Sequence, residues 1–276
     1  MHSPVVSVCT VTYNHEHFIR QCLEGIVMQQ TNFKFEAVIG EDCSTDGTGA
    51  VVREFEAKYP CIIKPCYHKK NMGPVQNMFL SCFPRLSGKY VAICDGDDMW
   101  TDTAKLQKQV DFLEANNEFS FCFHRANRVE GGKITDMLAP LDKMIVYKPH
   151  DIFHISIPTS TVVFRNYIKE IPRELLKVKS GDTFLFGMLS SYGGAVDMGF
   201  PGANYRIHNG GIYSGISRFK QYKQAVYTRK MMKNSPAFTE EQKIEISKEI
   251  KKRKKLYSKH FVKKGQFKNA LQILFT

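Results

Sequence analysis

The chain has 276 residues, of which 43% are hydrophobic and 24% are charged, as in ordinary globular proteins. This length suffices for one large domain or for a domain with an appendage, and it provides enough core for the chain to fold unaided. The net charge of +12 belongs to the tail, because residues 218–276 hold 17 lysines and arginines but only 4 glutamates.

The sequence shows no targeting or membrane-spanning segment. No apolar run reaches the length of a membrane span, and the N-terminal segment lacks the basic and then apolar pattern of a signal peptide. All eight cysteines lie within the first 122 residues, without repeated CxxC spacing. We interpret them as small core hydrophobes in a reducing compartment, and we therefore expect a cytoplasmic protein.

The first 130 residues alternate between strand and helix patterns. Strands are expected at 5–13, 35–41, 61–67 and 90–94, and helical patterns follow them over 19–30, 51–59, 74–83 and 103–115. Repeated strand and helix units of this kind form a mostly parallel sheet with right-handed crossovers. The expected fold class is therefore α/β, with a mostly parallel central sheet flanked by helices.

An acidic tetrad, DGDD, follows the strand at 90–94 directly. Asp95, Asp97 and Asp98 repel one another unless a cation neutralises them, and ligands of open α/β sheets collect at the carboxyl ends of strands. Oxygen ligands favour Mg²⁺ or Mn²⁺ over zinc. Gly96 lets the turn fold tightly and lets a ligand approach the backbone. The alternative is a solvated acidic turn that caps the next helix.

The second half is less regular. Strands are expected at 119–129 and 160–165, a hairpin turn at Gly131 and Gly132, a helix over 182–192, and a strand pair near 195–206. Residues 134–158 are irregular and apolar, which suggests a loop over the site. We expect His150 and His154 in this loop to be packed or solvated rather than catalytic.

Four segments of the first half resemble family 2 of the inverting glycosyltransferases, which have the GT-A fold. These segments, in order, are TVTYNHEHFIRQCL, EDCSTDGT, NMGPVQN and AICDGDD. The resemblance, to members of bacterial polysaccharide type, covers about 130 residues and implies a nucleotide-sugar donor, most simply a UDP-sugar, at the carboxyl ends of the first four strands. The only tryptophan is Trp100, so the QxxRW segment of the processive members is absent and we expect single-sugar addition.

The resemblance also assigns donor-binding roles to residues of the strand ends, namely Thr10, Thr12, Tyr13, Asp42, Asn71, Gly73, Asp95 and Gly96. It implies that Tyr13 stacks on the base and that Asp42 accepts the uracil N3–H. Asp95 is expected to hold ribose or sugar hydroxyls. From the residues alone, Asp42 could instead cap a helix and Tyr13 could close the core.

Asn71 and Gly73 are implied to shape the wall beside the base and ribose. For Asp46, which precedes the helix at 51–59, we favour a capping role.

The resemblance places the metal, Mn²⁺ or Mg²⁺, on Asp97 and adds His208 as a further ligand of the metal or diphosphate, with Gly210 and Gly211 close to phosphate. It makes Asp182 the catalytic base, since an acceptor hydroxyl needs a carboxylate to take its proton. The alternatives are a structural histidine and an ordinary helix N-cap.

The tail is expected to be helical over 217–234 and 240–262, with a last segment over 266–275. We expect a catalytic domain at 1–214, with its nucleotide-binding half at about 1–130 and its acceptor half at about 131–214, followed by a basic extension at 215–276. The lysines of residues 218–276 could dock on an anionic membrane surface, which would make the protein peripheral on the inner face. They could also be solvated faces of helices packed on the catalytic domain. Nucleic acid is not expected, because no recognition motif accompanies the charge.

These observations predict a metal-dependent glycosyltransferase that moves one sugar from a nucleotide-sugar to a hydroxyl of a glycan or lipid-linked glycan, with inversion. A sugar-nucleotide nucleotidyltransferase would need a glycine-rich basic loop after the first strand, which NHEHF is not. A non-catalytic sugar- or anion-binding module would need neither Asp97 nor Asp182.

Overall fold

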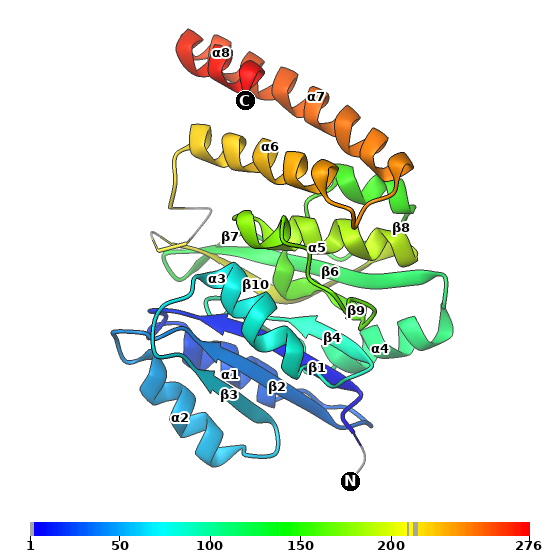
Figure 1. Ribbon diagram of the computed structural model, residues 1–276. Coiled ribbons are helices and arrows are strands. Elements are labelled where there is room, and N and C mark those ends of the chain that lie inside the picture. The colour runs from blue at the N-terminus through cyan, green and yellow to red at the C-terminus, as the bar shows by residue number, and fades with distance from the viewer. Residues whose placement is uncertain (1–2, 138, 209, 212–214) are drawn as a thin grey trace.

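The computed structural model describes residues 3–137, 139–208, 210–211 and 215–276. Its centre is one mixed sheet with the order β3-β2-β1-β4-β9-β6-β10-β5 (Figure 1). The first four strands are parallel, namely β1 (Val6–Thr12), β2 (Phe35–Glu41), β3 (Ile63–Tyr67) and β4 (Tyr90–Ile93). The α/β fold class expected from the sequence is thereby confirmed, and the carboxyl ends of these strands meet at one edge.

The other half of the sheet is mixed. Its strands are β5 (Met99–Trp100), β6 (Phe119–Glu130), β7 (Lys133–Asp136), β8 (Ile145–Tyr147), β9 (Val163–Arg165) and β10 (Gly194–Ile207). β9 is antiparallel to β4 and β6, whereas β10 runs parallel to β6 and antiparallel to β5. The hairpin turn between β6 and β7 lies at Gly131 and Gly132, as predicted, and both have positive φ.

The strand pair expected near 195–206 is instead one long strand, β10. Its register against β6 shifts between Asp197 and Pro201 and again between Pro201 and Ala203, so β10 bends there without ending. Gly199, at φ +78°, lies inside this bend. The segment at 134–158, expected to be a loop, contains β7, β8 and the 3₁₀ helix η3 (Pro149–His154).

Helices cover both faces of the sheet. One face packs against α1 (Ile19–Val27), α2 (Thr48–Lys58) and α4 (Lys105–Ala115). The other packs against α5 (Gly181–Leu189) and the segment formed by α3 (Pro74–Gln76), the π-helical η1 (Asn77–Cys82) and the 3₁₀ helix η2 (Phe83–Arg85). Residues of β1 alternate between these two cores, Val6 and Val8 in one and Cys9 and Val11 in the other. The strand is thus buried on both faces.

The expected helix at 74–83 is irregular because it is fastened by a buried side chain. Asn77 donates a hydrogen bond from Nδ2 to the carbonyl of Gly40 at 2.8 Å, and its Oδ1 lies 2.9 Å from His68 Nε2. A Cβ on Gly40 would lie 2.1 Å from Asn77 Oδ1, so only glycine fits at that position of β2.

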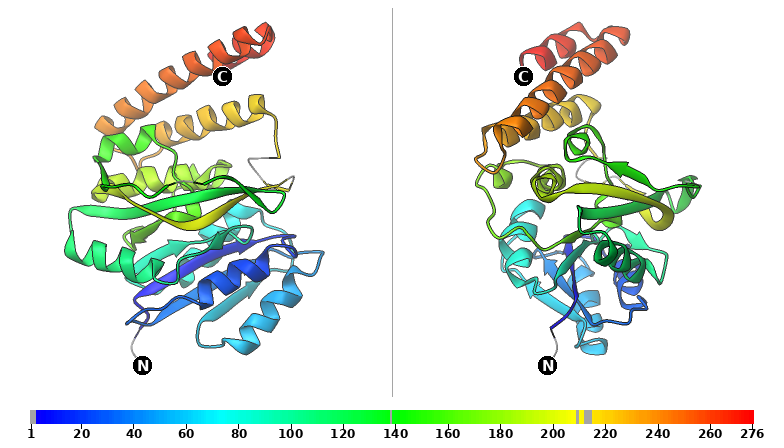
Figure 2. Two further views of the ribbon diagram at one scale, coloured as in Figure 1. Left: turned by 180° about the vertical axis from the view of Figure 1, so that it is seen from behind. Right: turned by 90° about the vertical axis from the view of Figure 1, so that its right-hand side faces the viewer.

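The tail forms three helices, α6 (Arg218–Asn234), α7 (Glu240–Lys263) and α8 (Phe267–Phe275). Figure 2 shows them stacked beyond α5, with α8 far from the parallel strands. The turn between α6 and α7 is fixed to the core on the α5 side of the sheet through Met232, Phe238 and Ile246. The predicted domain boundary at 214 and 215 adjoins residues 212–214, which lie outside the described part of the chain.

The far ends of these helices have a small core of their own. Tyr222 stacks on Tyr257 with ring centroids 3.8 Å apart, and Phe261 packs beside both with Ala270 and Ile273 of α8. Among the described residues, no helix combines the length and apolar character that crossing a membrane requires.

Candidate functional site

The acidic tetrad lies against the end of β1. Gly96 donates its N–H to the carbonyl of Val11 at 3.0 Å. A Cβ at Gly96 would lie 2.6 Å from Thr12 Oγ1 and 3.0 Å from His15 Nδ1. The turn therefore requires glycine, as the sequence suggested, because any side chain would push the tetrad away from the loop after β1.

The loops after β1 and β2 are tied to each other by hydrogen bonds. Asn14, with φ of 54°, accepts the N–H of Thr45 at 2.8 Å on its Oδ1. Asp46 accepts the N–H groups of Glu16 at 3.1 Å and of Thr48, the first residue of α2, at 3.0 Å. Asp46 thus serves the start of the helix, as expected, and also fixes the loop that carries His15.

Asp97 lies between two histidines that are remote in sequence. His208 Nε2 is 3.0 Å from Asp97 Oδ2, and His15 Nε2 is 3.9 Å from the same oxygen. One donor atom from each of the three residues fits within 4.8 Å. Burial alone would raise the pKa of Asp97, but the hydrogen bond with His208 and the charges of His15 and His208 hold it below its ordinary value. The structure therefore brings together the two predicted ligands and adds His15.

Three further carboxylates surround this group. Burial is the main cause that raises the pKa of Asp95 well above its ordinary value, and the charges of Asp97, Asp98 and Asp182 add to it. Asp98 is buried, accepts the Arg206 N–H at 3.0 Å, and has a pKa raised to about 7 by burial and by Asp97. So many carboxylates at one strand end favour a bound cation.

Asp182 is the second residue of α5, and Ser180 holds the N-cap position. Burial raises the pKa of Asp182, while the backbone N–H of Thr183 and the guanidinium of Arg229 offset part of this effect. A carboxylate with a raised pKa is better suited to take a proton from a hydroxyl than an ordinary one. Ser180 rather than Asp182 holds the N-cap position, while Asp182 lies in the first turn of α5 and its role as a base stays a prediction.

Asp42 and Gly73, two of the donor-binding candidates, lie in the loops that follow β2 and β3. Asp42 is buried and accepts the N–H groups of Met72 and Gly73, both at 2.8 Å, so it fixes the loop that carries Asn71. Gly73 has φ of +83°, which favours glycine at this corner. Each oxygen of Asp42 keeps a further acceptor site for a ligand.

The candidates on β1 differ in exposure. Tyr13 is 40% exposed, so its ring is available for stacking rather than closing the core. Thr12 lies beside the acidic turn. Thr10 has no exposed surface in this structure, so its donor-binding role stays a prediction.

Sequence reasoning missed several residues of this site. Arg206 donates from Nη1 to the carbonyl of Asp97 at 3.0 Å and lies over the ring of Phe18. Tyr205 is surrounded by the four carboxylates, which together with burial raise the pKa of its hydroxyl. The signal for His15 was its place in NHEHF, three residues after the first strand. Arg206 and Tyr205 depend on the pairing of β10, which local patterns do not reveal.

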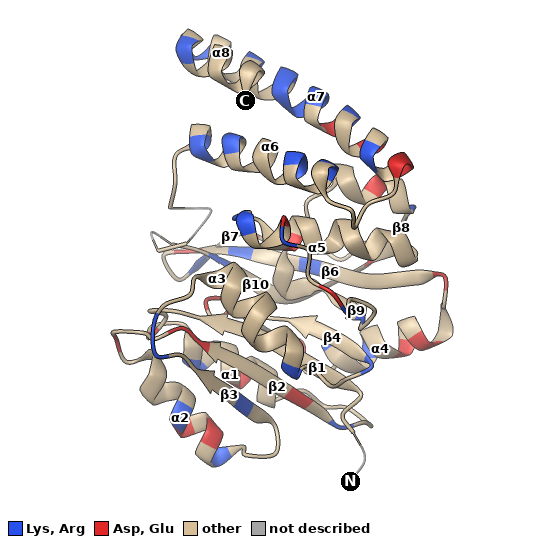
Figure 3. Cartoon of the chain, in the orientation of Figure 1, with Lys and Arg blue, Asp and Glu red and all other residues tan. Residues whose placement is uncertain are grey.

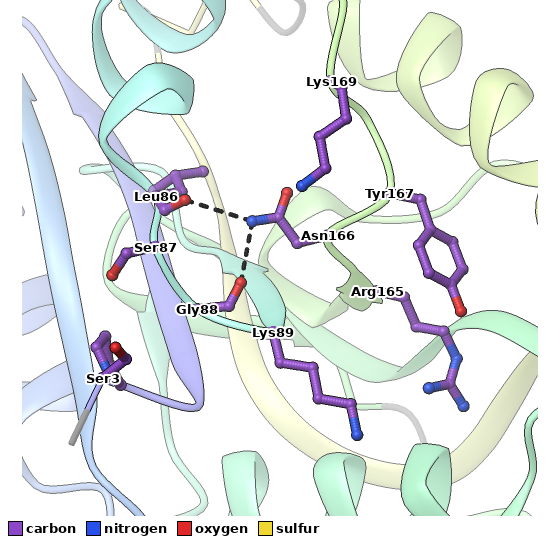
Figure 4. Close-up of a pocket in the computed structure, with 10 residues that line it drawn as sticks. Ser3, Leu86, Ser87, Gly88, Lys89, Arg165, Asn166, Tyr167 and Lys169 are labelled. Atoms are coloured by element: carbon purple, nitrogen blue, oxygen red, sulfur yellow. Dashed lines mark hydrogen bonds between the residues drawn. The ribbon is translucent and has the colours of Figure 1, made fainter.

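A surface hollow of about 520 Å³ lies at the opposite end of β4 (Figure 4). Its lining includes Lys89, Arg165 and Lys169. Arg165 already donates to the carbonyl of Phe119 at 3.0 Å and to the hydroxyl of Tyr90 at 3.2 Å, and Lys89 is paired with Glu114 at 2.7 Å. The hollow is at the amino ends of the parallel strands, so it is separate from the acidic tetrad.

A mixed sheet with an acidic tetrad at the carboxyl ends of its parallel strands defines a GT-A protein. The family model described as Glycosyl transferase family 2 matches residues 7–172, and the chain belongs to this family. Curated relatives agree. An uncharacterised protein of Mycobacterium tuberculosis is 40% identical over 119 residues, which are 43% of this chain and 34% of that protein. TuaG of Bacillus subtilis, a glycosyltransferase assigned to teichuronic acid biosynthesis, is 32% identical over 163 residues.

The chain spans about a third of the mycobacterial protein and 59% of TuaG. Solved structures match over most of this chain. S. aureus TarS residues 1–349, in complex with UDP-GlcNAc, has a TM-score of 0.63 at 20% identity, covering 93% of this chain and 72% of that one. The mannosyltransferase PcManGT from Pyrobaculum calidifontis, in complex with GDP-Man and Mn²⁺, has a TM-score of 0.64 at 16% identity, covering 99% and 74%. These similarities establish the fold.

Proposed function

We propose that the protein is a metal-dependent glycosyltransferase that transfers one sugar from a nucleotide-sugar, most simply a UDP-sugar, to a hydroxyl of a glycan or lipid-linked glycan with inversion. The observation that carries this proposal is that Asp97 and His208, 111 residues apart, meet at 3.0 Å, and that Asp95 of the same turn feels the charges of both Asp97 and Asp182. Membership of glycosyl transferase family 2 supports the reaction class, and the UDP-GlcNAc complex of TarS supports the donor class.

Asp182 acts as the base. Its carboxylate takes the proton of the acceptor hydroxyl while that oxygen bonds to the anomeric carbon and the bond from this carbon to the diphosphate breaks. Asp95 holds donor hydroxyls, and Tyr13, Asp42, Asn71 and Gly73 enclose the base and ribose.

Asp97 and His208 would hold Mn²⁺ or Mg²⁺, and their mixed oxygen and nitrogen donors fit such an ion. When bound, the ion supplies charge stabilisation to the leaving diphosphate.

The other two functions considered from the sequence are less well supported. The loop after β1 carries His15 and is tied to the loop after β2, and it offers no glycine-rich cradle for a triphosphate. A binding module would not need a buried carboxylate with a raised pKa at the start of α5.

We also propose that the tail docks on an anionic membrane surface. The exposed apolar side chains of α8 are Phe267, Leu271, Leu274 and Phe275. Phe267, Leu271 and Leu274 are four and three positions apart and Phe275 follows Leu274 directly, so all four share one face of the helix, while Ala270 and Ile273 belong to the small core formed by the tail helices. Figure 3 shows lysines and arginines distributed along α6 and α7. Apolar insertion next to basic charge fits an acidic bilayer.

The enzymatic proposal is tested by incubating the full chain with a panel of nucleotide-sugars and Mn²⁺, with candidate acceptors, and measuring nucleoside diphosphate release. We expect release with at least one donor, abolished by chelator and by Asp97→Asn, with the variant still folded. Asp111→Asn, an exposed change on α4, is the control. Full activity in excess chelator would refute the metal assignment, and absence of donor binding across the panel would refute the function.

A further inference from the structure

His15 shares the position of the two predicted metal ligands. Its Nε2 lies 3.9 Å from Asp97 Oδ2, an oxygen that is 3.0 Å from His208 Nε2. We infer that His15 is a third protein ligand, so that His15, Asp97 and His208 form a two-histidine, one-carboxylate site that prefers Mn²⁺ and other transition-metal ions over Mg²⁺. This inference rests on the metal dependence of the proposed function.

The distance between His15 and Asp97 is not that of a hydrogen bond, which requires about 2.7–3.2 Å. It does suit two atoms that bind one ion. Octahedral bonds of about 2.1 Å place neighbouring ligand atoms roughly 3 Å apart and opposite ones roughly 4.2 Å apart. The three donor atoms, all within 4.8 Å of one another, are close to this spacing.

The ring of His15 is held in the orientation that a ligand needs. Its Nδ1 is 3.3 Å from Thr12 Oγ1, so a proton on Nδ1 can be donated to Thr12, which leaves a lone pair on Nε2, the atom 3.9 Å from Asp97 Oδ2. Metal-binding histidines commonly have their second nitrogen fixed in this way. The backbone N–H of His15 is bonded to Thr48 Oγ1 at 2.8 Å, which fixes the loop itself.

The ring of His208 is also held in place, by two neighbouring rings. The ring of Phe18 packs on His208 with centroids 4.7 Å apart, and the rings of His15 and His208 meet edge to face at 6.0 Å. Both imidazoles are therefore ordered around the same carboxylate. Mg²⁺ prefers oxygen donors, whereas imidazole nitrogen raises the affinity for Mn²⁺ and the other divalent transition-metal ions. Two imidazoles beside one carboxylate therefore favour these ions over Mg²⁺.

The test measures metal binding by the full chain, with Mn²⁺ alone and with Mn²⁺ and UDP, by calorimetry and electron paramagnetic resonance. His15→Asn should lower Mn²⁺ affinity by about tenfold or more and change Mg²⁺ affinity much less. The control is His17→Asn, in the same loop with a side chain 83% exposed, which should leave both affinities unchanged. The electron spin-echo spectrum of Mn²⁺ bound to wild-type protein should show coupling to two histidine nitrogens. The spectrum of Mn²⁺ bound to His15→Asn should show coupling to one.

The outcomes separate this inference from the proposed function. Wild-type protein that binds Mn²⁺ through Asp97, with one histidine nitrogen and unchanged affinity in His15→Asn, would overturn the role of His15 and leave the function standing. Wild-type protein that binds no divalent ion, with or without UDP, would overturn the metal-dependent function itself. The wild-type spectrum decides the matter even if His15→Asn fails to fold.

Discussion

His154 Nδ1 and Glu249 Oε2 lie 2.6 Å apart and join the turn η3 to the tail helix α7. The other oxygen of Glu249 accepts a hydrogen bond from Arg253 Nε at 2.5 Å, and the side chain of Glu249 is almost fully buried. A structural role for His154 was expected from the sequence. Its partner Glu249, 95 residues later in the chain, was not predicted from the sequence.

Glu249→Ala should therefore loosen the tail from the catalytic core. The change leaves Arg253 and His154 without their shared carboxylate, and removing one partner of a buried ion pair costs about 3–5 kcal/mol. The free energy of unfolding from urea titration measures the effect. Glu240→Gln, at an 85% exposed side chain on the same helix, should change little. Equal stability of the two variants would mean that the turn is held by Met232, Phe238 and Ile246 alone.

The pH dependence of this contact has a definite sign. Burial by itself would raise the pKa of Glu249, but the hydrogen bond with His154 and the charge of Arg253 lower it below its ordinary value. A carboxylate whose pKa is lower in the folded than in the unfolded chain stabilises the fold at pH values above its pKa in the unfolded chain. This contribution is lost as the pH falls through its pKa in the folded chain. The stability gap between wild type and Glu249→Gln should hence narrow below about pH 4.

Asp182→Asn should remove most sugar transfer while leaving donor and metal binding intact. Loss of a general base costs about 10²- to 10⁴-fold in turnover, because the base acts in the transition state. In wild type, the rate should fall with decreasing pH through a pKa above the ordinary aspartate value, as burial of Asp182 requires. Ser180→Ala, at the N-cap position, is the control. A variant Asp182→Asn with normal turnover and a lower melting temperature would return Asp182 to a structural role.

Lys105→Met should stabilise the protein, and more so at pH 6 than at pH 9.5. Lys105 is fully buried over the ring of Trp100 at 4.0 Å, and burial lowers its pKa to about 7. As the pH falls below about 10.4, Lys105 gains a proton in the unfolded chain, whereas the buried lysine of the folded chain stays neutral. The free energy of unfolding therefore decreases as the pH falls, until the pKa of the buried lysine is reached.

We expect a gain of about 2–4 kcal/mol at pH 6, measured by urea unfolding, that shrinks at pH 9.5. The control is Lys108→Met, at an exposed lysine paired with Asp102 at 2.6 Å, which should lack this pH dependence. A destabilised Lys105→Met at pH 6 would show that the contact with Trp100 outweighs the desolvation of the charge.

Leu271→Glu with Phe275→Glu should weaken binding to vesicles that contain phosphatidylglycerol, and transfer to a small soluble acceptor should be unchanged. The two side chains are 56% and 84% exposed, so the fold tolerates the change, while two carboxylates oppose insertion and repel the lipid charge. Sedimentation with vesicles at rising salt measures the effect. Ile244→Glu, 57% exposed at the other end of the tail, is the control. Undiminished sedimentation of the double variant would refute docking through α8.

Local patterns predicted the parallel half of the sheet well, because each strand is a short apolar run followed by a polar loop. They also identified Asp97, and the family resemblance supplied His208. What they could not predict depends on which strands become neighbours. The two-residue strand β5 exists only because Met99 and Trp100 pair with Asn204 and Ala203 of β10.

The same limit explains the residues that were missed. His15 becomes a candidate ligand only when the turn at Gly96 packs against it, and the burial of Thr10 follows from the packing of the folded sheet. The choice between membrane and core for the tail could not be made from composition, since the α6–α7 turn packs on the core while α8 exposes an apolar face.

The bonds from Arg206 to the tetrad affect how segments of this chain can be exchanged with those of its relatives. The backbone N–H of Arg206 is held by Asp98, and its side chain is bonded to the carbonyl of Asp97. A chimera that took its β6–β10 region from another family member would therefore replace Arg206 but keep the carboxylate and the carbonyl to which it is bonded. The natural unit of exchange starts at residue 95 rather than at 119, so acceptor specificity should be transplanted together with the acidic turn.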